Sequence, residues 1–373
     1  VLLAPDGPLG ASLRIRRAKF HDLLEGRMPE KSKSRREESS SRSDGRPAVP
    51  KIINDRFLIK GEIGEGSYST VRRALDKTTG RTVALKFEWK NAEKTNKLLK
   101  EAELCSKLRT SASEVTPHVF WWGSQGEYNI MAMDLLGPSL EDLFSPRRKF
   151  SLKTVLMLAD RMISCMELVH SEGVVHRDIK PANFVVGRDS ECNKVFAIDF
   201  GLAKRYLDPE TGRHVEFVKK SGMTGTARYT TVHLHKGCEP SRRDDLGSIG
   251  YLLVYFLKGK LPWQGVNGKD KKARKKKIGR KKESISHAEL CRGCPEELVR
   301  YLDYCHDLGF EERPDYTFLR ELMKKAAARE EIAFDWKFDW MDSNCKRKRG
   351  YDEESDSYGY ESYEETETDE KSQ

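Results

Sequence analysis

The sequence has no run of about 18 apolar residues, the length that a membrane-spanning helix requires. Val1 to Ala4 are apolar, but Pro5, Asp6 and Gly7 follow at once, so the stretch is too short for the apolar region of a signal peptide. The eight cysteines have no repeated spacing, which argues against a disulfide framework. We therefore expect no membrane span and an intracellular protein with reduced thiols, in the cytoplasm and with the nucleus as a second location.

Apolar residues are also few for a chain of this length. Hydrophobic residues make up 37% of the 373 residues and charged residues 34%, which indicates a globular body joined to segments too polar to pack. Residues 28–50 are almost free of apolar side chains, and a strongly acidic stretch follows Lys346. The sequence predicts a disordered N-terminal arm over 1–56 and a disordered acidic tail over 341–373.

Positive charge exceeds negative charge, with a net charge of +9 and a pI of about 9.0. Such a balance favours an anionic partner: nucleic acid, an anionic membrane, or an acidic or phosphorylated protein. The densest basic run, from Lys269 to Lys282, lacks interleaved aromatic residues, so nucleic acid is not the favoured partner. A nuclear import signal and a solvated basic loop that serves substrate recognition both stay open for this run.

The pattern of hydrophobic residues changes from strand-like to helical along the chain. Residues 57–63 and 82–88 form short apolar runs separated by turn residues, which is typical of strands. Helical spacing follows at residues 94–108, 152–170, 249–257, 295–304 and 316–327. The N-terminal part is therefore expected to be mostly sheet with one helix, and the C-terminal part mostly helical.

A glycine-containing loop lies between the first two of these strands, within Gly64-Glu-Gly-Ser-Tyr-Ser-Thr-Val71. Small residues allow backbone N–H groups to approach phosphate oxygens closely. Ser69 stands where a third glycine is usual. The loop residues expected at the phosphates are Gly64, Glu65, Gly66, Ser67, Tyr68 and Ser69. Alone, the same pattern is also typical of an ordinary hairpin turn.

Lys86 follows in Val83-Ala84-Leu85-Lys86, on a strand from which a lysine can reach the α- and β-phosphates of a nucleotide. Such a lysine requires an ionic partner, and Glu101 on the next predicted helix is the expected one, whereas Glu103 would point from a different face.

The segment His176-Arg-Asp-Ile-Lys-Pro-Ala-Asn183 has the form HRDxxxxN. In this pattern the aspartate, Asp178, orients or accepts the proton of the substrate hydroxyl, and Asn183 holds a magnesium ion. Lys180 would offset charge on the transferring phosphoryl group. Asp199 in Asp199-Phe-Gly201 supplies a second carboxylate for the metal. The four motifs occur in one order along the chain, which indicates phosphoryl transfer from ATP with Mg²⁺.

Together these motifs resemble the protein kinase superfamily, and finer detail is similar to the casein kinase 1 family. The close segments are 135–144, 149–155, Gly225-Thr-Ala-Arg-Tyr229, Ser241-Arg-Arg-Asp-Asp-Leu246 and Leu261-Pro-Trp-Gln-Gly265. The resemblance implies an α+β bilobal kinase fold over residues 57–340. A small, mostly antiparallel β N-lobe with one helix would span about 57–134, and a larger helical C-lobe about 137–340. It also implies transfer to serine or threonine, and Asp245 as the residue that braces the catalytic loop.

The resemblance implies the residues around the nucleotide and the substrate. The adenine would lie among Ile63, Val71, Ala84, Val185 and Ile198, with Met133 at the inner pocket and Asp134 to Leu136 as the linker. Arg228 and Arg274, with Lys204 and Arg177, would bind phosphate or acidic side chains that precede the target residue of a protein substrate. Ser221 departs from the lysine common in this family. We expect a monomer.

Two other functions compete with an active kinase: a catalytically silent kinase fold that acts as a scaffold, and a basic nucleic-acid binder. A silent fold needs none of Lys86, Asp178, Asn183 and Asp199, so their presence favours the enzyme. The acidic tail holds Ser355, Ser357, Thr366 and Thr368 in the context that a basic substrate site would prefer. It could be a substrate of the chain itself or only a solvating segment.

Overall fold

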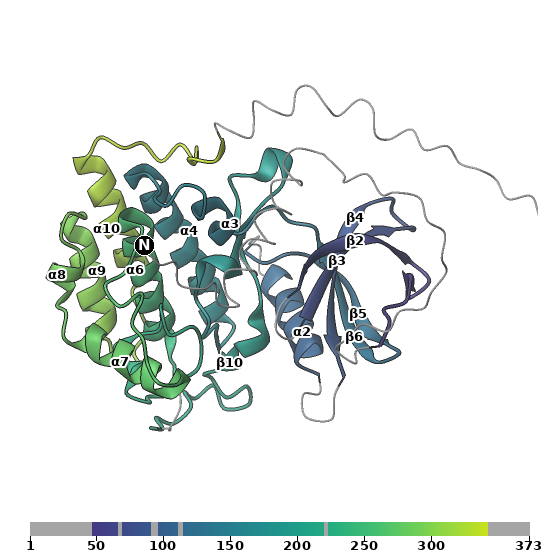
Figure 1. Cartoon of the computed structure of the whole chain (residues 1–373), viewed down its shortest axis with the longest axis horizontal. Helices are drawn as coiled ribbons and strands as arrows, with labels where there is room; N and C mark the ends of the chain where they lie inside the picture. Colours follow the sequence, from purple (N-terminus) through teal and green to yellow (C-terminus); the bar gives the residue numbers. More distant parts are fainter. Residues whose placement is uncertain (1–46, 66–68, 91–95, 111–114, 220–222, 342–373) are drawn as a thin grey trace, which may run out of the picture. The chain divides into compact units, whose positions relative to one another are not determined.

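The structure is a computed structural model, and it describes residues 47–65, 69–90, 96–110, 115–219 and 223–341 (Figure 1). The predictions for the arm before residue 47, for the tail after Met341, and for Gly66, Ser67 and Tyr68 lie outside the described residues.

The N-lobe is an antiparallel sheet of six strands in the order β1-β2-β3-β4-β6-β5, with helix α2 packed against β5 and β6. Its elements are β1 Ile52–Ile53, β2 Phe57–Glu65, β3 Ser69–Asp76, β4 Thr82–Trp89, α2 Lys97–Thr110, β5 Val119–Gln125 and β6 Tyr128–Asp134. Buried side chains alternate along β3, whereas β4 is buried at five consecutive positions. The predicted sheet with one helix is confirmed.

The ordered sheet begins before Phe57, although the sequence predicts a disordered arm up to residue 56. Ile52 pairs with Leu58, and Ile53 is fully buried. Arg56 donates two hydrogen bonds to Asp76, at 2.8 and 2.7 Å. A two-residue strand carries no periodic pattern, so only its partner strand reveals it.

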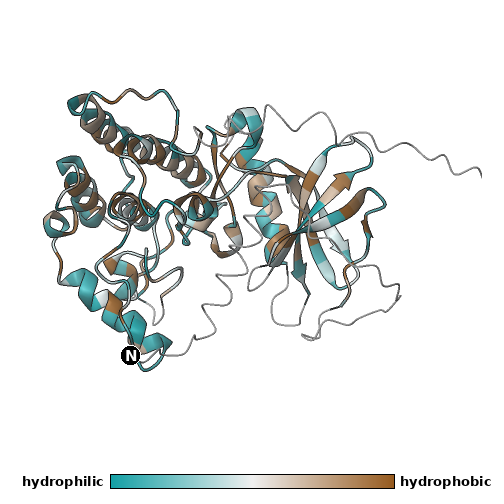
Figure 2. Ribbon diagram, turned by 45° about the horizontal axis from the view of Figure 1, so that its top comes forward, coloured by the Kyte–Doolittle hydropathy of each residue, from teal (hydrophilic) through white to brown (hydrophobic). Residues whose placement is uncertain are grey.

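The C-lobe is mostly helical, as predicted. Its helices are α3 Leu140–Phe144, α4 Leu152–Ser171, α5 Val232–His235, α6 Arg242–Lys258, α7 Lys271–Glu283, α8 His287–Leu290, α9 Glu296–Asp307 and α10 Tyr316–Arg329. Short strands and 3₁₀ turns follow α4: β7 Val174–Val175, η1 Pro181–Asn183, β8 Phe184–Val186, η2 Asp189–Glu191, β9 Val195–Ala197, η3 Phe200–Leu202 and β10 Lys204–Arg205. Helix α4 packs against α6 and α10 in the lobe core, where Figure 2 shows hydrophobic colouring.

From Lys271 onward the basic run Lys269 to Lys282 lies in helix α7, and not in the loop that the sequence predicts. Asp270 caps the N-terminus of α7 by accepting a hydrogen bond from Ala273 N at 2.7 Å. Lysine and arginine are good helix formers. The run contains so few apolar residues, however, that the sequence shows no amphipathic pattern from which the helix could be predicted. The helix is held to the lobe through Ile278, Gly279 and Lys282, which are buried.

Within the described ranges, no helix is long and apolar enough to cross a membrane. The seven cysteines of these ranges are all free thiols.

We predict that Gly250→Leu destabilises the C-lobe. A Cβ at Gly250 in α6 would lie 2.5 Å from the Leu302 side chain and 3.0 Å from the Tyr301 ring of α9, so there is no room for a larger group. Overpacking of this kind costs about 1 to 3 kcal/mol. The melting temperature should fall measurably. Gly61→Leu, in β2, is the control, because the nearest atom there is a flexible arginine end at 3.9 Å; equal melting temperatures for the two variants would contradict the prediction.

Candidate active site

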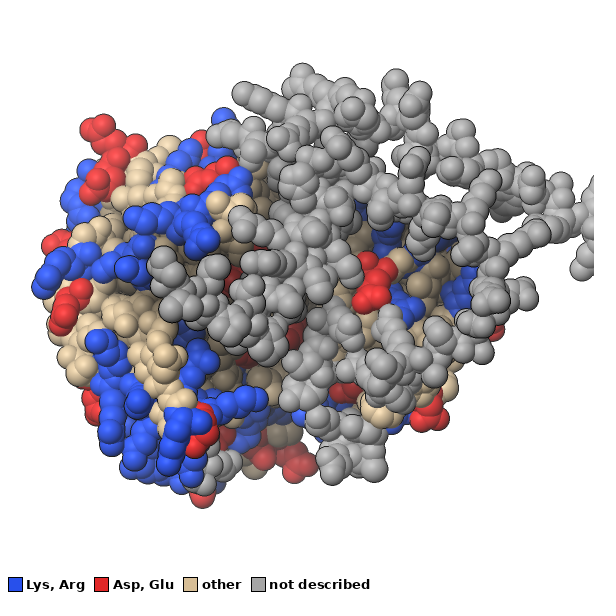
Figure 3. All heavy atoms as spheres, in the orientation of Figure 1, with Lys and Arg blue, Asp and Glu red and all other residues tan. Residues whose placement is uncertain are grey.

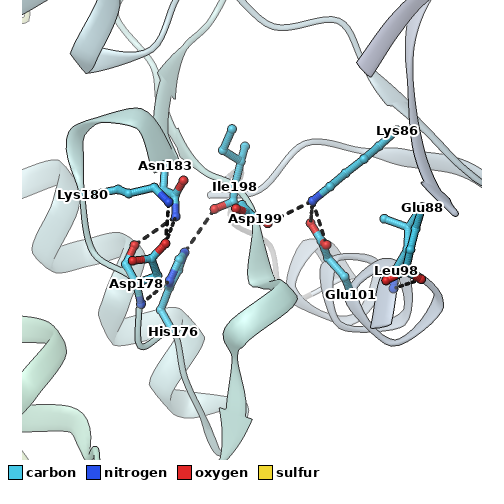
Figure 4. Close-up of polar contacts among 10 residues, drawn as sticks. All are labelled: Lys86, Glu88, Leu98, Glu101, His176, Asp178, Lys180, Asn183, Ile198 and Asp199. Carbon is cyan, nitrogen blue, oxygen red and sulfur yellow. Dashed lines mark hydrogen bonds and ion pairs between the residues drawn. The ribbon is translucent and has the colours of Figure 1, made fainter. Parts of the chain in front are cut away.

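Lys86 lies at the centre of an ion cluster that joins the two lobes, in which Lys86 and Glu101 are buried and Asp199 is half-buried (Figure 4). Its Nζ is 2.8 and 2.9 Å from the two carboxylate oxygens of Glu101 and 3.1 Å from Asp199 Oδ1. Burial disfavours the charge of Lys86, but the two carboxylates outweigh this effect and raise the pKa of its ammonium group. The lysine is therefore charged, and Glu101 is its partner on α2, as predicted.

Glu88 holds α2 in the position that this ion pair requires, and the sequence did not reveal this role. Its Oε2 accepts hydrogen bonds from Leu98 N at 3.1 Å and from Asn129 Nδ2 at 3.2 Å. Leu98 is in the first turn of α2, where backbone N–H groups lack partners within the helix. Glu88 and Lys86 are two residues apart on β4 and hence on one face of the strand, which is the only sequence signal.

Asp178 and its neighbours form the second half of the site. Lys180 Nζ is 2.5 Å from Asp178 Oδ2, and Asn183 Nδ2 donates to the backbone oxygen of Asp178 at 2.9 Å. Thr226 Oγ1 donates to Asp178 Oδ1 at 2.7 Å. Thr226 was not among the predicted site residues, because it is 48 positions away and only the fold brings it here. The Asp178 carboxylate is thus oriented by groups on both of its oxygens.

Asp245 of α6 braces the loop that carries Asp178, as the resemblance implies. It is buried, and it accepts hydrogen bonds from His176 N at 2.7 Å and Arg177 N at 2.9 Å. His170 Nε2 lies 3.0 Å from the same carboxylate. Burial would raise the pKa of Asp245, but these hydrogen bonds and nearby charges outweigh it and lower the pKa.

The backbone at Asp199 is left-handed, with φ 66° and ψ 66°. This conformation is uncommon for a residue other than glycine and persists only where its surroundings hold it. Here Phe200 is buried with its ring 4.9 Å from that of His176, and His176 Nε2 lies 3.1 Å from Ile198 O. The side chain of Asp199 is thereby directed to Lys86.

The residues expected around an adenine come from both lobes. Ala84 and Met133 are directly paired across β4 and β6, and Val185 is in β8. Ala84 and Val185 are buried, whereas Ile63 on β2 is 43% exposed. Val71 and Ile198 are half-buried.

In the linker from Asp134 to Leu136, one of the backbone N–H groups expected to face an adenine is already hydrogen-bonded within the protein. The Asp134 N–H donates to His118 O at 2.9 Å, so it is already used within the lobe. Among the described residues, no group accepts a hydrogen bond from the N–H of Leu136, which leaves it for a ligand.

Asn183 and Asp199 offer amide and carboxylate oxygens of the kind that Mg²⁺ prefers. Asn183 uses its Nδ2 to bind Asp178, which turns its oxygen to the other side. No cluster of three or more His, Cys, Asp or Glu side chains suited to a metal ion exists in the described ranges. Mg²⁺ in phosphoryl-transfer enzymes is held by one or two protein oxygens together with phosphates and water, so these two residues fit it.

Residues 57–325 match a family model described as the protein kinase domain. The chain belongs to the protein kinase family. The fold is accordingly the bilobal kinase fold, and kinases of this family use ATP and a divalent metal to phosphorylate protein substrates. The match does not extend to a subfamily, and the casein kinase 1 resemblance is taken up below.

In this kinase, residues 225–231 approach the catalytic loop so closely that only glycine fits at one point. Gly225 has φ +85°, and a Cβ there would lie 2.5 Å from Arg177 O. Trp263 Nε1 donates to Arg228 O at 2.7 Å. Lys282 of α7 donates to Ala227 O at 3.0 Å and also to Thr230 O. The 225–231 loop is thus held in place by the side chains of Trp263 and Lys282, which are distant in sequence.

The sequence suggests that Lys282 is exposed, like the rest of the basic run. In the structure it is buried. Its side chain is 3% exposed, and its Nζ lies 4.8 Å from the ring centroids of both Tyr251 and Trp263. Within the described part of the chain its bonds go to backbone carbonyls. Burial lowers its pKa well below the ordinary value for lysine.

The four residues predicted to bind an anion have different surroundings. Arg228 is half-buried and donates to Tyr229 Oη at 3.3 Å, and Arg274 lies on α7. Lysine and arginine side chains gather over α7 at the lower left of Figure 3. By contrast, Lys204 Nζ lies 2.6 Å from Glu239 Oε1, and Arg177 Nε donates to Leu202 O at 2.6 Å.

We predict that Lys282→Met weakens peptide binding far more than ATP binding. Methionine is similar in size but removes the Nζ that donates both hydrogen bonds, so the buried carbonyls of the 225–231 loop lose their partner at a cost of about 1 to 3 kcal/mol each. KM for a peptide substrate should rise while KM for ATP stays near the wild-type value. Lys281→Met, an exposed neighbour on the same helix, is the matched control. Identical peptide KM values for the two variants would show that Lys282 does not support the loop.

Proposed function

We propose that this protein is an active serine/threonine kinase of casein kinase 1 type that phosphorylates acidic or pre-phosphorylated proteins, with ATP and Mg²⁺. The observation that carries the proposal is that Lys180 and Thr226 are both already hydrogen-bonded to Asp178 beside the intact Lys86 ion cluster. A catalytically silent scaffold would not need these contacts. No feature of the site therefore favours the scaffold function over the kinase activity.

Asp178 is the group that orients the attacking hydroxyl. It is 6% exposed, and its Oδ1 accepts a hydrogen bond from Thr226, a neutral donor that leaves the carboxylate charge in place. A substrate serine or threonine hydroxyl would donate to this carboxylate and lose its proton to it as the new bond forms. Thr226 belongs to the 225–231 loop, so the group that receives the proton is linked directly to that loop.

Lys180 and Lys86 supply positive charge on either side of the reacting phosphate. Lys86 is held ready by Glu101 and Asp199, and Lys180 lies against Asp178, where it can stabilise charge on the transferring oxygens. Bound Mg²⁺, held by Asn183 and Asp199, would neutralise phosphate charge. The preference for serine or threonine rests on Lys180 and on the family resemblance.

Arg228 and Arg274 are the proposed site for the acidic or phosphorylated residue of the substrate. Helix α7, which carries Arg274, is bonded to the loop that carries Arg228 through Lys282, and Lys275 Nζ reaches Met223 O at 3.5 Å. The two arginines therefore belong to neighbouring elements of one surface. A guanidinium binds phosphate through two parallel hydrogen bonds, which suits both residues to this role.

The decisive experiment is transfer of labelled phosphate from ATP and Mg²⁺ to acidic or pre-phosphorylated peptides by the purified chain. We predict activity for the wild type and a loss of several orders of magnitude for Asp178→Asn, because the amide cannot accept the proton. The melting temperature of the variant should stay close to that of the wild type. If the wild type and Asp178→Asn transfer phosphate equally poorly, the proposed activity is wrong.

We further predict that Arg228→Ala/Arg274→Ala selectively impairs phosphorylation of peptides that carry a phosphate before the target residue. Charge-assisted hydrogen bonds contribute roughly 1.5 to 3 kcal/mol each, so kcat/KM on such peptides should fall at least about tenfold. Activity on unphosphorylated peptides should change little. Lys277→Ala/Arg280→Ala removes the same charge from other positions of α7 and is the control. Equal losses on both peptide classes would assign the two arginines to the fold instead.

A further inference from the structure

A cavity of about 610 Å³ lies between the C-terminal half of α4 and the first turns of α6 and α10. Helix α4 packs against both of the other helices in the C-lobe (Figure 1). None of the residues proposed above for ATP, the metal or the substrate lines this cavity. Pockets for small ligands have volumes of about 300 to 1,000 Å³, so the cavity has room for a small molecule.

The charged side chains that line the cavity are three arginines and one glutamate. Arg242 is the first residue of α6, Arg313 precedes α10, and Arg320 lies within α10. Arg320 Nε donates to the buried Asp160 at 2.9 Å, so the charge of Arg320 is balanced. Glu167 of α4 is the only acidic side chain in the lining, so a net positive charge of one remains.

Neutral oxygens hold the guanidinium of Arg242 in place. Its Nη1 donates to Tyr206 Oη at 3.2 Å, its Nη2 donates to Glu311 O at 2.5 Å, and its Cζ lies 4.5 Å from the centroid of the Tyr206 ring. Arg313 is exposed. Within the described ranges neither Arg242 nor Arg313 forms an ion pair. The position of Arg242 is therefore fixed, while its charge is left for an anion from outside the described residues.

The ends of two helices add to the positive potential of the cavity. Helix α6 begins at Arg242 and α10 begins at Tyr316, and both residues line the cavity. The N-terminus of a helix is equivalent to about half a positive charge. The C-terminal end of α4 opposes this effect, but His170 O there already accepts hydrogen bonds from Tyr206 Oη and Gly173 N. The cavity as a whole therefore favours an anion.

We propose that this cavity binds a small phosphomonoester, with its phosphate at Arg242, Arg313 and Arg320 and its organic group against Leu168 and Tyr316. A phosphate group offers three acceptor oxygens to guanidinium groups that come from different elements, whereas a carboxylate offers two. The cavity is larger than a phosphate ion requires, and Leu168 and the Tyr316 ring give it an apolar wall. The site is separate from the proposed ATP and substrate sites, so the proposal does not depend on the proposed kinase function.

The test measures the dissociation constant of phenyl phosphate by ligand-observed NMR in a phosphate-free buffer. Every form of the protein carries Arg228→Ala/Arg274→Ala, so that the proposed substrate-anion site does not contribute, and Mg²⁺ with a non-hydrolysable ATP analogue is in excess. Arg313→Ala should weaken binding about tenfold or more, because charge-assisted hydrogen bonds are lost. Lys324→Ala removes an exposed charge of α10 outside the cavity and is the matched control, with an unchanged dissociation constant.

Glu167→Gln tests the same site in the opposite direction. The substitution keeps the size of the side chain and removes the only negative charge in the lining, so phenyl phosphate should bind severalfold more tightly. Damage to the fold would not strengthen binding, which separates this result from a structural effect. Unchanged dissociation constants for both Arg313→Ala and Glu167→Gln would overturn the proposal.

Two further probes separate the phosphate from the organic group. Inorganic phosphate should bind more weakly than phenyl phosphate because it lacks the ring, and phenol should bind most weakly because it lacks the charge. Equal affinities for phenyl phosphate and inorganic phosphate would overturn the assignment to a phosphomonoester, and equal affinities for phenyl phosphate and phenol would overturn the role of the arginines. Loss of binding on addition of the ATP analogue would place phenyl phosphate in the ATP site and would also overturn the proposal. None of these measurements requires phosphoryl transfer, so their outcome is independent of the kinase assay.

Discussion

The buried carboxylate of Asp245 is the constraint on which the catalytic half of the site depends. It binds the backbone N–H groups of His176 and Arg177 and the ring of His170, and so fixes the chain just before Asp178. A carboxylate that is buried away from water needs hydrogen-bond donors from the protein. Asp245 can therefore be buried only when the loop places its N–H groups at the carboxylate. The helix that carries Asp245 is almost wholly buried, so the catalytic loop is attached to the core of the C-lobe.

Two other buried polar side chains extend this logic to the substrate side. Lys282 binds the carbonyls of the 225–231 loop, and Glu239 forms an ion pair with Lys204. The elements they hold are otherwise irregular backbone, which packing alone orders weakly. Buried polar groups with specific partners confer a definite geometry on these loops.

Much of the site follows from the sequence because catalysis requires particular residue types at short, fixed spacings. The pairs Asp178 with Asn183 and Lys86 with Glu101 are evident from the motifs alone, and so are the sheet, the main helices and the brace at Asp245. The failures have one cause. Glu88, Thr226 and Glu239 contact partners that lie 10 to 48 positions away in the sequence. Hydrophobic periodicity in a single sequence carries no information about such contacts.

The sequence by itself determined the kinase family, the order of the lobes and the candidate groups for catalysis, because motifs and hydrophobic periodicity are local properties of the chain. Only the tertiary structure decided which charges are buried and what they face. Lys282 and Lys281 are neighbours in one basic run, yet one is inside the lobe and the other is exposed. Glu239 resembles any other glutamate until the fold places it beside Lys204. Burial and partner distance decide what a charge does, and both arise only when distant segments pack together.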